Sequence, residues 1–303
     1  MKKKVVVGMS GGVDSSVAAC LLKEQGYDVI GVTMQIWQEE DSCTVEENGG
    51  CCGLSAVEDA RRVAWTLGIP YYVMNFRKEF QKNVIDYFVA EYLHGRTPNP
   101  CIACNRYVKW EALLERSLEI GADYIATGHY ARIEKLPNGR YALRKSATSA
   151  KDQTYALYNL TQEQLKRTLM PVGDYSKDQI RDMAEKIGLP TAHKRILRRS
   201  ALWMITIMRD LSTNTVREKC RRAILWTKTV KVLGRHKGIT RYTIGQRKGL
   251  NIALGKPVFV QKICPETNEV VLGSNEDLLQ PPCGRTAEFY GSGRYSGRDR
   301  STW

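Results

Sequence analysis

The segment Gly8–Ser15 constrains the fold of this chain more than any other feature. It reads Gly-Met-Ser-Gly-Gly-Val-Asp-Ser, follows the apolar run Val5–Val7 and opens an amphipathic stretch from Ser15 to Gln25. A strand that turns through glycines into a helix directs backbone N–H groups and the positive helix end at one point, where an anion can bind. The segment lacks the lysine of a Walker loop. A plain glycine turn is the alternative, but Ser-Gly-Gly-x-Asp-Ser is not general turn composition.

Apolar runs alternate with amphipathic stretches throughout the first third of the chain, which is the pattern of a parallel α/β sheet. Such a sheet binds ligands beyond the carboxyl ends of its strands. The expected strands are Val5–Val7, Val29–Met34, Tyr71–Asn75 and Tyr124–Thr127, and the expected helices are Ser15–Gln25, Ala56–Leu67 with a capping box from Ser55 to Glu58, Lys78–Leu93 and Tyr107–Ile120.

Turn and capping signals predict further elements. Asn138-Gly139 predicts a hairpin, and two capping boxes predict two more helices. A glycine-punctuated region without helical periodicity then predicts a small second domain. The hairpin strands are Arg132–Lys135 and Arg140–Lys145, the boxes are Thr161 with Gln164 and Ser176 with Gln179, the second helix ends at Gly188, and the later strands are Thr240–Ile244, Pro257–Ile263 and Glu269–Leu272.

The length of 303 residues is enough for two or three domains. No apolar run approaches the roughly 18 to 20 residues that span a bilayer, and the start of the chain does not have the pattern of a signal peptide. Nine irregularly spaced cysteines do not form a secreted disulfide framework. We therefore expect a cytoplasmic protein with reduced thiols and no membrane partner.

The phosphate loop resembles that of the ATP-pyrophosphatase superfamily, whose members adenylate a substrate oxygen and release pyrophosphate. Further motifs narrow the resemblance to the tRNA-specific 2-thiouridylases. The resemblance implies a parallel doubly wound sheet, similar to the adenine nucleotide alpha hydrolases, followed by a small β-rich central domain. The motifs are Cys52-Gly53-Leu54-Ser55, Gly95 to Asn105, Thr127 to Ala131, Lys151-Asp152-Gln153, Tyr242 to Arg247 and Leu272-Gly273-Ser274.

The same resemblance implies the roles of individual residues. It makes Cys104 the catalytic cysteine. Asn99, Pro100 and Cys101 are expected to lie against the target base. His129, Lys151, Asp152 and Gln153 are expected to contact tRNA. The implied ATP-binding residues are Gly8, Met9, Ser10, Gly11, Gly12, Val13, Asp14, Ser15, Met34 and Gly128.

The implied reaction uses ATP with Mg²⁺ and thiolates an anticodon wobble uridine of tRNA. The uridine C2 oxygen attacks the α-phosphate, and pyrophosphate leaves. A persulfide sulfur then attacks C2, AMP departs, and two cysteines close a disulfide that a reductant reopens. The partners are tRNA and a persulfide sulfur-donor protein, and the base must be extruded to reach the site.

The cysteines alone allow other interpretations. Cys101 and Cys104 form a Cys-x-x-Cys, which we place on the loop before a helix, where the helix dipole favours a thiolate. A zinc site would need a second spaced pair, and Cys51 and Cys52 are adjacent. An iron–sulfur cluster is a further alternative. For Cys20 and Cys264 we favour inert buried thiols, and no metal site is predicted.

The resemblance breaks after His193. The family carries its persulfide on a second cysteine within Ser-Gln-Glu-Ile-Cys-Phe a few residues later, and Arg195–Ala201 lacks this motif. Written as CGG ATT CTC AGG AGA TCT GC, the stretch read from its third base encodes Asp-Ser-Gln-Glu-Ile-Cys. The missing cysteine would then fall at Ala201. We therefore predict a frame break over about 195–232 and impaired thiolation.

A second break is expected after Gln280, where the family's C-terminal β-barrel is not recognisable. The predicted domains are 1–193 (ATP-binding and catalytic), 194–232 (anomalous segment), 233–280 (small β-rich domain) and 281–303 (aberrant tail). Charge agrees with this division. Of the net charge of +14, Lys194–Lys231 carries eleven basic and two acidic residues, or +9, and Gly284–Trp303 carries four and two, or +2, which leaves +3 elsewhere.

The alternative to a frame break is that Lys194–Lys231 is a divergent basic arm that binds tRNA. Two functions of other classes also remain open. The chain could be a non-catalytic remnant that binds ATP or tRNA. An ATP-pyrophosphatase acting on a small molecule would form an adenylate without tRNA and would need no Cys104.

Overall fold

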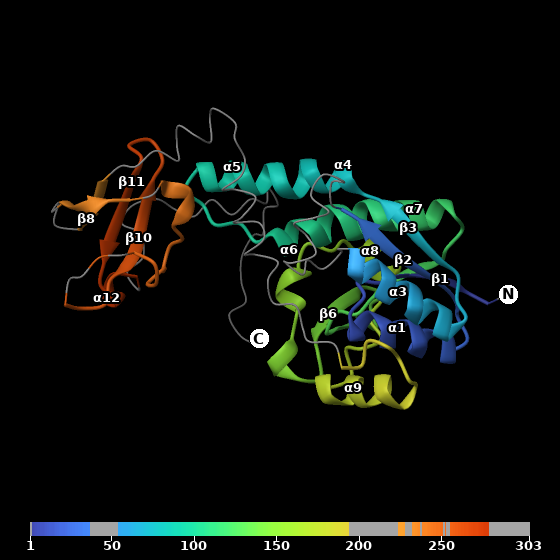
Figure 1. Cartoon of the computed structure of the whole chain (residues 1–303). Helices are drawn as coiled ribbons and strands as arrows, with labels where there is room; N and C mark the ends of the chain where they lie inside the picture. The colour runs from blue at the N-terminus through green and yellow to red at the C-terminus, as the bar shows by residue number, and fades with distance from the viewer. Residues whose placement is uncertain are drawn as a thin grey trace.

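The described part of the computed structural model contains a five-stranded sheet, a four-stranded sheet and a two-stranded hairpin, with helices around them (Figure 1). None of the helices within the described ranges is long and apolar enough to cross a lipid bilayer. The structure describes residues 2–36, 54–193, 224–227, 232–236, 238–250, 252 and 255–278.

The large sheet has five strands in the order β3-β2-β1-β4-β7, and every neighbouring pair is parallel. The first strand is therefore central, and the chain leaves it in the middle of the carboxyl edge, where ligands bind in such sheets. The strands are β1 (Lys4–Gly8), β2 (Asp28–Gln35), β3 (Tyr71–Asn75), β4 (Tyr124–Thr127) and β7 (Thr168–Leu169).

Helices cover both faces of this sheet, because successive residues of a strand point to opposite sides. Val5 and Val7 of β1 pack in one core with α1, α3 and α9, whereas Val6 packs in the other with the helices between β3 and β4. The helices are α1 (Val13–Glu24), α3 (Leu54–Leu67), α4 (Arg77–Phe80), η2 (Gln81–Asp86), α5 (Tyr87–Leu93), α6 (Pro100–Ala103), η3 (Cys104–Leu113), α7 (Leu114–Glu119), α8 (Gln162–Lys166) and α9 (Lys177–Lys186).

The first four predicted strands and the doubly wound class are confirmed. The hairpin is confirmed as β5 (Ala131–Lys135) with β6 (Tyr141–Lys145). Short helices η4 (Ser149–Lys151) and η5 (Thr154–Ala156) follow it. Both capping boxes, at α8 and α9, form as expected.

Two helix starts were predicted wrongly. Ser55 lies inside α3 and does not cap it, and Glu58 pairs with Arg61 instead. The helix expected from Tyr107 begins at Pro100, because the Asn99 side chain accepts a hydrogen bond from the Cys101 amide and proline suits the first helical position. Cys101 and Cys104 therefore lie within helical turns and not on a preceding loop.

The small domain is a four-stranded sheet in the order β10-β11-β8-β9. Its helix η6 contacts α5 of the large domain, so the small sheet lies beyond the end of α5 (Figure 1). The expected strand Thr240–Ile244 is wrong, since η6 and turns occupy it. The elements are β8 (Ile224–Thr227), β9 (Val232–Arg235), η6 (Ile239–Arg241), β10 (Phe259–Cys264), β11 (Glu269–Gly273) and α12 (Asn275–Leu278).

Most of the predicted anomalous segment and the whole predicted tail, 281–303, lie outside the described residues. Within 194–232 the structure describes β8, which pairs in parallel with β11 and antiparallel with β9. The domain boundaries and the frame break remain predictions.

Candidate functional site

The phosphate loop connects β1 to α1 at the centre of the carboxyl edge. Gly11 has a φ of +65°, and a Cβ atom there would lie 2.4 Å from the carbonyl oxygen of Ala56. Only glycine suits this position, because both the backbone conformation and the space exclude a side chain. Gly12 is the N-cap of α1 and has no side chain to cap its first amides. The loop thus has the geometry of an anion site at a helix N-terminus.

Internal hydrogen bonds hold the loop in shape. The Met9 amide donates to the Val32 carbonyl over 2.8 Å, and the Thr33 hydroxyl donates to the Met9 carbonyl over 2.7 Å. The Ser15 hydroxyl accepts from the Ser10 amide and donates to the Gly12 carbonyl. Ser15 therefore closes the loop on itself.

Two predicted ATP-binding residues outside the loop lie at the same edge. Gly8 is paired with Val32, so Met34 follows on β2 just beyond the end of β1. Gly128 follows β4, and a Cβ atom there would lie 2.6 Å from the Ser15 amide nitrogen. The chain after β4 can thus pack on the first turn of α1 only because residue 128 is glycine.

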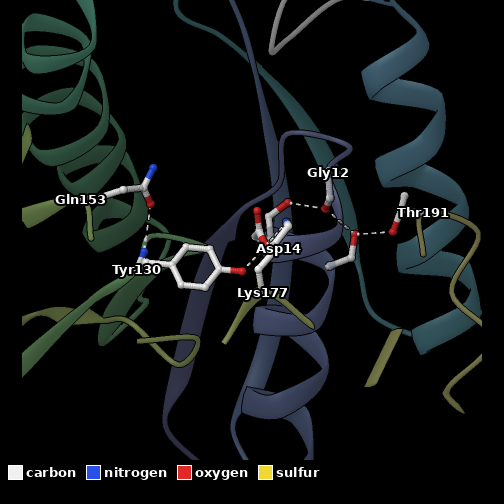
Figure 2. A network of polar contacts seen from close by, with 8 residues as sticks. Gly12, Asp14, Tyr130, Gln153, Lys177 and Thr191 are labelled. Carbon is white, nitrogen blue, oxygen red and sulfur yellow. Dashed lines mark hydrogen bonds and ion pairs between the residues drawn. The ribbon is translucent and has the colours of Figure 1, made fainter. Parts of the chain in front are cut away.

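Asp14, in the first turn of α1, is the centre of a polar network (Figure 2). Its Oδ1 atom accepts hydrogen bonds from the Tyr130 hydroxyl and from the Lys177 ammonium, each over 2.6 Å. Burial, and then the neighbouring Asp14 carboxylate, raise the pKa of Tyr130, so the phenol stays protonated and donates. Neither Tyr130 nor Lys177 was predicted as a site residue.

The network continues from Tyr130 to the predicted tRNA-contacting segment (Figure 2). The Gln153 side-chain oxygen accepts from the Tyr130 amide over 2.9 Å, and the Gln153 amide donates to the Tyr130 carbonyl over 3.0 Å. Asp152 accepts from the Ser146 amide and the Thr154 hydroxyl. The side chains of Asp152 and Gln153 thus shape their own turn, and Lys151, half-buried beside them, ends η4.

Cys101 is exposed and Cys104 partly buried, one turn apart in the helix that Asn99 caps. This helix runs back to the start of β4, so its first turn lies at the carboxyl edge. Asn105 ties that turn to the segment after Gln153, because its amide donates to the buried Ala156 carbonyl over 3.0 Å. The neighbour of Cys104 is therefore bonded to the same stretch of chain that contacts Tyr130 beside the phosphate loop.

His129 follows Gly128 and contacts the Trp110 ring, with a centroid distance of 5.5 Å. Its Nδ1 lies 2.8 Å from the Thr127 hydroxyl oxygen. Part of the residue is accessible to solvent, but the surrounding protein and then the Lys109 ammonium lower the pKa of the ring well below its usual value. His129 is therefore neutral at pH 7 and can exchange hydrogen bonds without adding charge.

Of the other described cysteines, Cys20 is buried as expected, whereas Cys264 is only partly buried. Burial, and then Glu24, raise the pKa of Cys20 to about 11, and burial raises that of Cys264. No group of three or more His, Cys, Asp or Glu within the described ranges is arranged to hold a metal ion. Cys51 and Cys52, weighed above as zinc ligands, and Ala201 lie outside those ranges.

Sequence patterns could not have shown that Tyr130 donates a hydrogen bond to Asp14 or that Lys177 forms an ion pair with Asp14. Tyr130 lies in a motif, but its contact with Asp14 spans 116 positions, and that of Lys177 spans 163. The only local signal at Lys177 is the capping box that starts α9 immediately before it.

Two family models match the chain. Residues 3–196 match the model described as "tRNA methyl transferase HUP domain", and residues 211–274 match "tRNA methyl transferase PRC-barrel domain". Among solved structures, "a 4-thiouridine synthetase - RNA complex with bound ATP" is 20% identical with a TM-score of 0.38 over 64% of this chain and 43% of that chain. That superposition is too weak to support an argument.

Curated relatives are much more similar. The "tRNA-specific 2-thiouridylase MnmA" of Lachnoclostridium phytofermentans is 68% identical over 277 residues, which cover 91% of this chain and 78% of the relative. "tRNA-specific 2-thiouridylase MnmA 2" of Clostridium tetani is 60% identical over 279 residues, or 92% and 77%. The models' descriptions name methyl transfer, whereas the relatives' names state 2-thiolation of uridine. We assign the family from the relatives, because they align with nearly the whole chain at high identity. The chain therefore belongs to the tRNA-specific 2-thiouridylase family.

Proposed function

We propose that this protein uses ATP to activate the C2 oxygen of an anticodon wobble uridine in tRNA for 2-thiolation. The observation that supports this most directly is a chain of hydrogen bonds: Asp14 beside the phosphate loop bonds to Tyr130, and Tyr130 bonds to Gln153. Ala156, three residues after Gln153, bonds to Asn105, the neighbour of Cys104. An adenylating site and a sulfur-handling thiol must lie together if one base is to pass through both steps.

The loop supplies the chemistry of the first step. Backbone amides and the N-terminal end of α1 face the position where the negative charge of the departing pyrophosphate accumulates. The hydrogen bonds of Ser15 with Ser10 and Gly12 hold the loop in a shape that can accept phosphate groups. ATP is therefore the substrate that we assign to this loop.

Magnesium fits the residues present. Mg²⁺ usually keeps several waters and takes one or two carboxylates beside phosphate oxygens, so it needs no large protein cage. Asp14 is a carboxylate in the first turn after the loop and would hold the ion together with the triphosphate. The ion would supply positive charge as pyrophosphate leaves.

Cys104 would take part in the sulfur step, with a persulfide-donor protein as partner. In the family the sulfur is carried by a second cysteine, and this chain has alanine at the expected position, 201. We propose that 2-thiolation is impaired for this reason, whereas ATP and tRNA binding persist. We place the protein in the cytoplasm, because its proposed tRNA substrate is found there.

The test incubates the full chain with ATP, tRNA and a persulfide donor, and follows pyrophosphate release and 2-thiouridine separately. We expect tRNA-dependent pyrophosphate release without 2-thiouridine. A variant in which Arg195–Ala201 is replaced by Asp-Ser-Gln-Glu-Ile-Cys should form 2-thiouridine, and Cys104→Ser in that variant should abolish it.

Other outcomes would favour the alternative functions. Pyrophosphate release that needs a small molecule and no tRNA would indicate the ATP-pyrophosphatase that acts on a small molecule. Retention of ATP or tRNA without any turnover, also in the variant with the restored cysteine, would indicate a binding remnant. Rapid 2-thiouridine formation by the unchanged chain would contradict the proposed impairment.

A further inference from the structure

Lys177 lies at the phosphate loop although it belongs to none of the motifs that define the loop. Its side chain is only 10% exposed, and its Nζ atom lies 2.6 Å from Oδ1 of Asp14. The loop itself has no lysine. A buried ammonium therefore comes to a phosphate site from a helix far along the chain.

The structure holds Lys177 rigidly in this place. Gly173, four residues earlier, contacts Ala131 so closely that a Cβ atom would lie 1.9 Å from the Ala131 carbonyl oxygen. Ser176 then caps α9, and its box partner Gln179 bonds back to the Ser176 amide. The position of Lys177, the first residue of α9, is therefore set from both sides.

Helix α9 also braces α1 along its length. Ile180 and Ala184 of α9 are fully buried in the core that contains α1. After α9, the Thr191 hydroxyl lies 3.2 Å from that of Ser16, which donates to the Gly12 carbonyl (Figure 2). The segment from Lys177 to Thr191 thus contacts the first turn of α1 at two points.

The charges of Asp14 and Lys177 suggest why the two side chains are paired at this loop. The Asp14 carboxylate is 31% exposed beside a loop that is built for anions, and without a cation beside it its negative charge would repel an approaching triphosphate. The Tyr130 hydroxyl satisfies a hydrogen bond but carries no charge. Among the described residues, the Lys177 ammonium is the cation that forms an ion pair with Asp14.

We propose that Lys177 is a positioning residue of the ATP site: its ammonium fixes and neutralises the Asp14 carboxylate, so that the phosphate loop can accept a nucleoside triphosphate. The inference rests on the proposed function only in taking ATP as the ligand. It assigns to α9 a role in nucleotide binding in addition to its structural one.

A double-mutant cycle tests this role, with ATP affinity of the full chain measured by calorimetry in the presence of Mg²⁺. We expect Lys177→Met to weaken ATP binding by about tenfold, the usual size of a lost charge-assisted hydrogen bond. In an Asp14→Asn background the same change should cost less than about twofold, because the carboxylate that needs the ammonium is gone. Each loss from Lys177→Met is taken relative to its own background, so the loss of affinity that Asp14→Asn causes by itself does not enter the comparison.

Two further variants separate charge from folding. Lys177→Arg keeps the charge and should keep ATP affinity within about threefold of the unchanged chain. Lys186→Met removes a lysine from the exposed end of the same helix and should leave ATP affinity unchanged. Thermal unfolding and tRNA affinity are measured in parallel, and neither should follow the change in ATP affinity.

The outcomes are distinguishable. Equal losses from Lys177→Met in both backgrounds would overturn the inference, because Lys177 would then act without Asp14. Parallel losses of ATP and tRNA affinity with a lowered melting temperature would reduce Lys177 to a structural residue. If Lys177→Met does not fold, loss of ATP affinity in a folded Lys177→Arg variant overturns the inference. Absence of ATP binding by the unchanged chain would instead contradict the proposed function.

Discussion

Asp14 in the large domain and His236 in the small domain are the centres of two polar clusters that are built in opposite ways. Asp14 is charged, partly exposed and held by two side chains. His236 is fully buried, and within the described residues its ring bonds to backbone groups, with Nδ1 accepting from the Gly238 amide and Nε2 donating to the Asn268 carbonyl. Burial lowers the pKa of His236, so its ring is neutral.

The difference separates a site from a structural support. Backbone partners satisfy both ring nitrogens of His236, so the cluster has a complete set of bonds and holds a turn in place. The Asp14 cluster places the ion pair of Asp14 and Lys177 beside an anion-binding loop, where a bound anion would interact with both charges. Four predictions would sharpen this contrast or contradict it.

The largest effect is expected from Gly11→Ala. The new Cβ would lie 2.4 Å from the Ala56 carbonyl oxygen in a backbone conformation with a φ of +65°, so the loop must move. We expect roughly 100-fold weaker ATP binding, measured by calorimetry. The matched control is Gly139→Ala, which has a φ of +81° and no atom within 4 Å of the new Cβ, and which should cost about 1 kcal/mol of stability and no ATP affinity. Equal effects of the two changes on ATP binding would contradict the assigned loop.

His236→Ala should affect only the small domain. The change leaves the Gly238 amide and the Asn268 carbonyl without their buried partner and opens a cavity, at a cost of about 2 to 4 kcal/mol. Hydrogen exchange should accelerate in peptides from 232–278, while those from 54–193 and the ATP affinity stay unchanged. Faster exchange at the phosphate loop would show that the two clusters are coupled.

Acid should destabilise the small domain through the same histidine. The pKa of His236 in the folded protein is below the usual 6.5, so the unfolded chain binds the proton first as pH falls. The stabilising contribution is complete above about pH 6.5 and is lost as the pH falls from there through the lower folded pKa. Urea unfolding of the small domain at several pH values measures this loss, and a stability that is flat between pH 7.5 and 5 would contradict a neutral buried ring.

Tyr130→Phe should have the smallest effect. It removes one of two donors to Asp14 and leaves the ammonium of Lys177, so the carboxylate remains neutralised. We expect a loss of about 1 kcal/mol in stability and at most about threefold in ATP affinity. A loss larger than that of Lys177→Met would mean that the hydroxyl, and not the charge, sets the position of Asp14.

Sequence patterns were most informative where structure depends on neighbouring residues. Strand β4 was predicted at its observed bounds, and both capping boxes formed, because periodicity and capping act within a few residues. Predictions were wrong where a second local signal outweighed the one on which they rested. Asn99 with Pro100 started a helix earlier than expected, and the turn at Tyr242 replaced a strand that its composition favoured.

The phosphate loop, the parallel sheet and the family could be predicted from the sequence, since the pattern that indicates each of them lies in residues that are close together along the chain. The surroundings of Asp14 could not be predicted in this way and became known from the packing of the fold. Tyr130 and Lys177 approach it from 116 and 163 positions away, and their contact depends on how α9 packs against α1. Such partners leave no periodic or local trace, because hydrogen bonds and ion pairs act over a few ångströms in space regardless of separation along the chain.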